Sequence, residues 1–153
     1  MQIEDYIKAG KIASEVREMV RVKDWIGKSV YEICEWVEEE IKKRGAKCAF
    51  PVNTSINEVA AHYTAEPNDP ITIKDTDLVK IDLGAQINGY IADTAVTVCY
   101  DAQYDSLVQA AEEALNNAMS MIKSGVKVSD VGRTIETTIK QLGFKPIANL
   151  SGH

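Results

Sequence analysis

The sequence predicts an α+β fold in which helices cover an antiparallel sheet. Four segments carry apolar residues at helical spacing. A segment rich in Val, Ile and Thr surrounds the dipeptide Asn88-Gly89, which is the strongest short signal for a strand hairpin. No linker or low-complexity stretch separates these segments, so we expect one domain over residues 1–153.

The composition restricts the classes of function. The 153 residues are 45% hydrophobic and carry a formal charge of −6 without a dense Lys/Arg block, which argues against nucleic acid as the primary partner. No apolar run has the length of a membrane span, and the N-terminus lacks the apolar core of a signal peptide. Three cysteines without a CxxC motif fit a reducing compartment. We therefore expect a cytoplasmic protein.

Two helices are expected at the start of the chain. The first covers residues 2–22. The second begins at Ser29, because Ser29 and Glu32 have the spacing of a capping box, and it ends at Gly45. The expected inward positions are Ile3, Tyr6, Ile7, Gly10, Ala13, Val16 and Val20 in the first helix, and Val30, Ile33, Cys34, Val37 and Ile41 in the second.

Residues 46–75 are less regular and are expected to form short strands and loops before the hairpin. Two more helices are expected after the hairpin, over residues 105–123 and 129–142, and they are closed by Gly125 and Gly143. The expected inward positions of the third helix are Leu107, Val108, Ala111, Leu115, Ala118 and Ile122.

The fourth helix resembles the second at a shift of 98 positions, which carries Val30 onto Val128. Several residues are identical at this shift, including the glycines that close the two helices. After a gap of two residues, the Asn-x-Ser of residues 53–55 matches that of residues 149–151. We therefore expect an internal duplication, with residues 1–100 as the first pseudo-repeat and residues 101–153 as the start of the second.

Two aspartates mark the predicted hairpin. If its central dipeptide forms a two-residue type I′ turn, Asp82 lies opposite Ala95 and Asp93 lies opposite Gly84. Because side chains alternate along a strand, these four residues share one face, and the aspartates are diagonal neighbours about 7–8 Å apart. Gly84 and Ala95 would leave the space between the carboxylates empty.

Converging carboxylates repel each other unless a cation lies between them. The gap suits two metal ions about 3.5–4 Å apart, which is the spacing of two-metal hydrolytic sites. In the structural alternative, one aspartate caps a loop and the other pairs with a lysine. The pattern alone leaves both readings open.

Three motifs resemble those of methionine aminopeptidases of type II, which have the pita-bread fold. Residues 82–85 (DLGA) and 89–93 (GYIAD) are similar to the first metal-binding hairpin of that family, and residues 149–153 (NLSGH) to the segment with its histidine ligand. Residues 50–63 (FPVNTSINEVAAHY) resemble the stretch that precedes the hairpin. The resemblance covers the whole chain, with the motifs in the family's order.

The resemblance implies removal of the initiator methionine from nascent peptides by a site with two divalent metal ions, Co, Mn, Fe or Zn. It implies that Asp82, Asp93 and His153 bind metal and that His62 forms a hydrogen bond with the scissile amide of the substrate. Phe50 and Asn53 would line the methionine pocket. From the residues alone, three of these have a structural alternative: His62 and Phe50 as core residues, and His153 as a frayed end.

The family site also requires two glutamates and a histidine from its second half, and none follows His153 in this sequence. We therefore expect an incomplete pita-bread fold that is inactive alone, and that pairs with the missing half or with a second copy. Two alternatives are a related peptidase such as a proline dipeptidase and a non-catalytic pita-bread binding module.

Overall fold

The computed structural model describes residues 3–150 of the chain. The chain divides between Asp101 and Ala102 into unit 1 (residues 1–101) and unit 2 (residues 102–153), each with its own packing. Unit 1 contains a four-stranded sheet and two helices, and unit 2 is helical among its described residues. The α+β class is therefore confirmed.

The sheet of unit 1 is built around a central strand. β3 (Leu78–Ile87) pairs along its whole length with β4 (Tyr90–Cys99). β1 (Lys47–Cys48) and β2 (Asn53–Ile56) pair in succession with the other edge of β3, and all pairings are antiparallel. The short strands fall inside the segment expected to be irregular, so this prediction is confirmed.

The turn between β3 and β4 has the predicted geometry. Asn88 and Gly89 both have positive φ, 52° and 88°, as a type I′ turn requires. This turn sets the register, which places Asp82 opposite Ala95 and Gly84 opposite Asp93. The predicted register is therefore confirmed.

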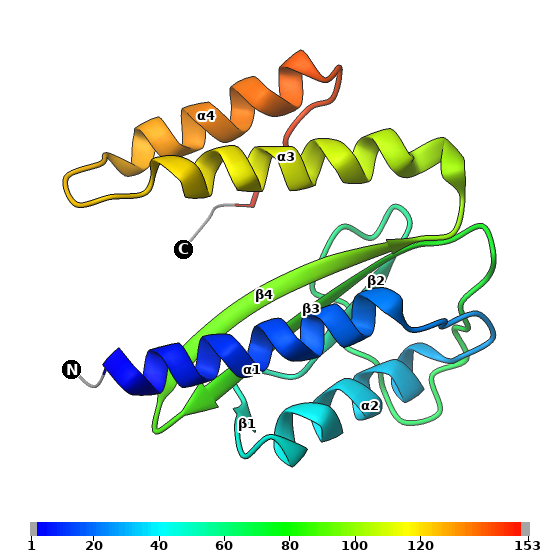
Figure 1. Ribbon diagram of the computed structural model, residues 1–153. Helices are drawn as coiled ribbons and strands as arrows, with labels where there is room; N and C mark the ends of the chain where they lie inside the picture. Colours follow the sequence, from blue (N-terminus) through cyan, green and yellow to red (C-terminus); the bar gives the residue numbers. More distant parts are fainter. Residues whose placement is uncertain (1–2, 151–153) are drawn as a thin grey trace. The chain divides into compact units, whose positions relative to one another are not determined.

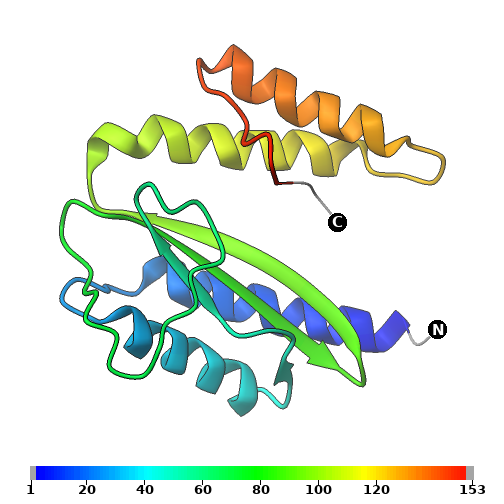
Figure 2. The ribbon, with the colours of Figure 1, turned by 180° about the vertical axis from the view of Figure 1, so that it is seen from behind.

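Two helices cover one face of this sheet. α1 (Ile3–Val22) crosses the hairpin, in front of the strands in Figure 1 and behind them in Figure 2, and α2 (Val30–Lys43) packs beside it. The core lies between helices and sheet because alternate residues of β3 point toward the helices. These buried β3 residues are Val79, Ile81, Leu83, Ala85 and Ile87.

The predicted inward face of α2 is confirmed, whereas that of α1 is wrong in its first two turns. All five predicted α2 positions are buried. In α1 the buried line runs instead through Ala9, Ile12 and Ala13 to Val16 and Val20. Ile3, Tyr6 and Ile7 are exposed, and the buried line begins only at Ala9. The Tyr6 ring packs edge-on against Tyr90, with 4.8 Å between the ring centroids.

α2 begins and ends as predicted. The Ser29 side chain accepts a hydrogen bond from the Glu32 N–H, and the Glu32 carboxylate accepts one from the Ser29 N–H, so the capping box is complete. At the other end Gly45 has a φ of 80°, which a residue without a Cβ adopts at little cost.

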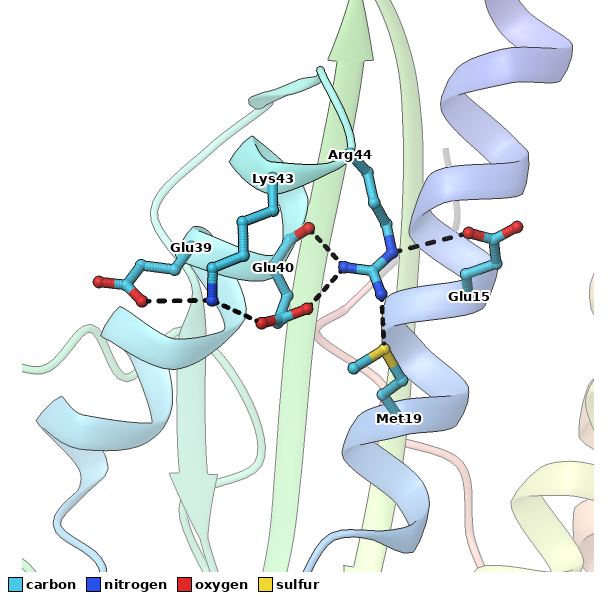
Figure 3. Close-up of polar contacts among 6 residues, drawn as sticks. All are labelled: Glu15, Met19, Glu39, Glu40, Lys43 and Arg44. Atoms are coloured by element: carbon cyan, nitrogen blue, oxygen red, sulfur yellow. Dashed lines mark hydrogen bonds and ion pairs between the residues drawn. The ribbon is translucent and has the colours of Figure 1, made fainter.

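An ion-pair cluster links α2 to α1 (Figure 3). The Glu40 carboxylate receives the Arg44 guanidinium at 2.6 Å and the Lys43 ammonium at 2.9 Å. Arg44 also lies 3.6 Å from the Glu15 carboxylate, and its guanidinium contacts the Met19 sulfur. The hydrogen bonds from Arg44 and Lys43 lower the pKa of Glu40 below its ordinary value of 4.5.

Unit 2 contains a single turn of 3₁₀-helix, η1 (Ala102–Tyr104), followed by α3 (Asp105–Met121) and α4 (Val128–Gln141). The predicted helix bounds are confirmed within two residues, and of the predicted inward positions of α3 Ala118 is confirmed, whereas the larger apolar ones are wrong. Leu107, Leu115 and Ile122 are exposed. The buried positions are Ala110, Ala114 and Ala118, whose small side chains face one way at four-residue spacing.

α4 ends with the same hydrogen bonds as α2. In both helices the N–H of the closing glycine and that of the next residue bond carbonyls in the last turn, which is the Schellman pattern. The pairs are Gly45–Lys42 and Ala46–Ile41 in α2, and Gly143–Lys140 and Phe144–Ile139 in α4. Each bond of one helix is displaced by 98 positions from its equivalent in the other.

Among residues 3–150, no helix combines the length and apolar character that a membrane crossing requires.

Candidate metal centre

Asp82 and Asp93 lie on the face of the hairpin opposite to the helices. Asp82 belongs to the β3 row of Lys80, Asp82 and Gly84, and its neighbours Ile81 and Leu83 point into the core. Since Gly84 is the cross-strand partner of Asp93, the two aspartates are diagonal neighbours. The structure therefore brings the two predicted ligands together on one surface.

The donor set fits a divalent cation. The Asp82 Oδ1 atom is buried and accepts no hydrogen bond among the described residues, although Asp82 makes other interactions. Oxygen donors from carboxylates suit hard and borderline divalent metals. Within residues 3–150, no group of three or more His, Cys, Asp or Glu side chains is arranged so that it could hold a metal ion, and these two carboxylates are the predicted ligands that the structure describes.

Phe50 occupies the space beside Gly84, which corrects the expectation of an empty gap. The Ala49 N–H donates a 2.9 Å hydrogen bond to the Gly84 carbonyl and holds this segment against β3. A Cβ at position 84 would lie 2.4 Å from Cε1 of Phe50 and 2.9 Å from Cβ of Ala49. Gly84 is therefore required by the close approach of the ring, and the predicted pocket residue Phe50 lies against the cross-strand partner of Asp93.

Asn53 lies directly opposite Asp82 across the β2–β3 pair. On its other side, Asn53 forms a bridge with Thr64, and its amide Nδ2 donates to the Thr64 hydroxyl at 2.9 Å. The order Thr64, Asn53, Asp82 and Ala95 thus runs across the sheet on one face. Adjacent strands lie about 4.8 Å apart, so Thr64 is about 10 Å from Asp82 along this row.

His62 is exposed, and it does not pack in the core. It precedes the segment that bridges to β2, and its φ is 67°, in the left-handed region that residues with a Cβ avoid. The structural alternative of a core histidine is therefore wrong.

Lys80 shares this face with the aspartates. Its ammonium donates to the Asn57 carbonyl at 2.5 Å, and burial lowers the pKa of Lys80.

The third predicted ligand, His153, lies outside the described residues.

Sequence reasoning missed Ser55, Tyr63 and Thr64 as neighbours of the site. Their contacts depend on pairing between β2 and a loop eight to eleven residues further along the chain. The only local signal was the mixed polar and apolar character of residues 53–56.

Comparison with known proteins identifies the family. A family model described as "Metallopeptidase family M24" matches residues 4–153. A methionine aminopeptidase of Pyrococcus abyssi is 50% identical over 153 residues, which are 100% of this chain and 52% of that protein. One from Methanothermus fervidus is 44% identical and aligns with 99% of this chain and 87% of its own length. The chain spans about half the length of the first of these relatives.

Solved structures agree with this family. A methionine aminopeptidase of Thermotoga maritima superposes with a TM-score of 0.90 at 32% identity, over 99% of this chain and 65% of that one. A prolidase of Pyrococcus furiosus gives 0.82 at 28% identity, over 93% of this chain and 43% of that one. The predicted pita-bread fold is thereby confirmed. On its sequence and its fold, the chain belongs to metallopeptidase family M24.

Proposed function

We propose that the protein removes the N-terminal methionine from peptides and nascent chains, and that this chain supplies part of its metal site. The observation that carries the proposal is the diagonal pair Asp82 and Asp93 beside Phe50 and Gly84. The names of the relatives from Pyrococcus abyssi and Thermotoga maritima support methionine as the residue removed.

The proposed roles follow from position. Asp82 and Asp93 hold two divalent ions, with His153 as a further ligand. When bound, the ions act as Lewis acids for the scissile carbonyl and lower the pKa of the attacking water. The Phe50 ring forms an apolar wall for the methionine side chain. His62 orients the scissile amide through a hydrogen bond, and Asn53 holds the edge of the pocket.

The first experiment measures methionine release from a Met-Ala-Ser peptide with Mn²⁺ or Co²⁺. The chain is assayed alone and after mixing with the C-terminal half of the Pyrococcus abyssi relative. We expect release in the mixture, a loss of at least 100-fold with Asp93→Ala, and normal activity with Asp75→Ala, a control on an exposed loop. Calorimetry with Mn²⁺ provides a second measurement, in which Asp93→Ala weakens binding and Asp75→Ala does not.

Two results would reject the proposal. Cleavage of an X-Pro dipeptide in place of Met-Ala-Ser would favour the proline dipeptidase alternative. The chain is similar in fold to the prolidase of Pyrococcus furiosus. A folded, metal-loaded mixture that cleaves neither peptide would favour a binding module, whose partner should still bind the double variant Asp82→Ala/Asp93→Ala.

A further inference from the structure

The backbone conformation of His62 needs a cause. A left-handed φ of 67° is unfavourable for a histidine, and such conformations persist only where neighbouring contacts impose them. The side chain of His62 is exposed, so packing around the imidazole does not provide those contacts.

The contacts come from β2 and act on the two residues that follow His62. The Thr54 N–H donates to the Tyr63 carbonyl at 2.9 Å, and the Tyr63 N–H donates to the Ser55 hydroxyl at 3.2 Å. The Asn53 amide donates to the Thr64 hydroxyl at 2.9 Å. We call these three bonds the β2 clasp. They fix both backbone polar groups of Tyr63, and therefore the peptide that leaves His62.

The side chain of Tyr63 provides a second anchor. Its hydroxyl donates to Oδ2 of Asp69 at 2.7 Å, while Oδ1 of Asp69 accepts the Ile71 N–H at 3.0 Å. Burial acts to raise the pKa of Asp69, but the hydrogen bonds from Ile71 and Tyr63 lower it overall, so the carboxylate stays an acceptor at neutral pH. Tyr63 is thus held at its N–H, its carbonyl and its hydroxyl.

We propose that Ser55 and Tyr63 are positioning residues, which act on the substrate only by holding His62 in its left-handed conformation at the edge of the aspartate face. The proposal rests on the proposed function. It follows from the row Thr64, Asn53 and Asp82, which ties the His62 segment to the strand that carries a predicted ligand. A rotation at His62 would move the imidazole relative to the aspartates without changing either aspartate.

The test uses Tyr63→Phe in the mixture described above, because this variant keeps the ring and loses only the bond to Asp69. Tyr31→Phe is the matched control, since Tyr31 lies on α2 and its hydroxyl makes no hydrogen bond among the described residues. We expect Tyr63→Phe to lower kcat about tenfold with KM changed less than twofold. Tyr31→Phe should change neither constant.

A double-variant cycle separates positioning from a general structural role. In a His62→Ala background, Tyr63→Phe should cause no further loss of activity, because its effect passes through the imidazole. An equal fold-loss in both backgrounds, or a normal kcat in Tyr63→Phe, would overturn the proposal.

A measurement on the chain itself keeps the inference independent of activity. Ser55→Ala should speed hydrogen exchange of the Tyr63 amide about tenfold, whereas Ser14→Ala, on the exposed side of α1, should leave it unchanged. Unaltered exchange in a folded Ser55→Ala chain would overturn the role of Ser55. If the wild-type mixture releases no methionine while the clasp behaves as expected, the proposed function fails and the conformational role of the clasp stands.

Discussion

Helices α2 and α4 share their length and their end signals but lie in different surroundings. Both span fourteen residues, and both close on a left-handed glycine with equivalent hydrogen bonds. They also share an ion pair at four-residue spacing, Lys42–Glu38 and Lys140–Glu136. The difference lies in burial: Val30 has no exposed area, whereas its equivalent Val128 is 85% exposed.

This difference separates two factors: the local signals that determine the ends of a helix, and the packing that buries one of its faces. Spacing and end signals determine where each helix begins and ends, and they act within a few residues. Burial depends on a partner surface, which the sheet provides for α2 within unit 1. In unit 2 the described partner of α4 is α3, a single helix.

The largest expected effect tests this contrast directly. Ile41→Ala in α2 should lower the free energy of unfolding by about 3 kcal/mol, because it empties a fully buried site. Ile139→Ala in α4 should cost about 1 kcal/mol, because that side chain is only partly buried. Hydrogen exchange of the amides in each helix measures the two losses separately. Equal losses would contradict the contrast.

The helix starts offer a smaller and reciprocal test. Ser29→Ala removes the capping box of α2 and should cost about 1 kcal/mol. The N-cap of α4 is Lys127, which has extended backbone but makes no capping hydrogen bond with its side chain, so Lys127→Ser should stabilise α4 by about 0.5–1 kcal/mol. Lys127→Ala is the control, and a gain of the same size there would contradict capping as the cause. Urea unfolding followed by helix-specific probes provides the measurement.

The smallest expected effect concerns pH. Hydrogen bonds from Arg44 and then Lys43 lower the folded-state pKa of Glu40. The Glu40 carboxylate therefore contributes to the free energy of unfolding above its unfolded pKa, near 4.5, and this contribution is lost as pH falls through the folded pKa. Thr138 occupies the equivalent position in α4. Glu40→Gln should therefore reduce the acid-induced fall in the melting temperature of unit 1. An unchanged slope in the Glu40→Gln variant would contradict the assignment.

Local signals predicted the elements that short-range chemistry controls. The capping box located the start of α2, and Asn88-Gly89 set the register that makes Asp82 and Asp93 diagonal neighbours. Periodicity did not predict which apolar positions of α3 are buried, because Leu107 and Ala110 both fit a helical stripe and the neighbouring helix selects between them. The roles assigned to the site residues remain predictions.

The surroundings of the site were not predictable in the same way. The pairing of Asn53 with Asp82 and the seating of Phe50 on Gly84 join residues about thirty positions apart, and no local pattern encodes such a pair. The left-handed conformation of His62 also arises from a strand that precedes it in the chain. These contacts are set by tertiary packing, which propensities do not describe.

The Phe50 ring on Gly84 has an electrostatic consequence for the carboxylates. A hydrocarbon ring next to the cross-strand partner of Asp93 covers one side of the proposed cation site, where it would displace water and lower the local permittivity. At 4 Å, two opposite unit charges attract by about 1 kcal/mol in water and about 4 kcal/mol at an effective permittivity of 20. An aromatic side chain that carries no charge would thus strengthen the binding of the proposed cation by the two aspartates.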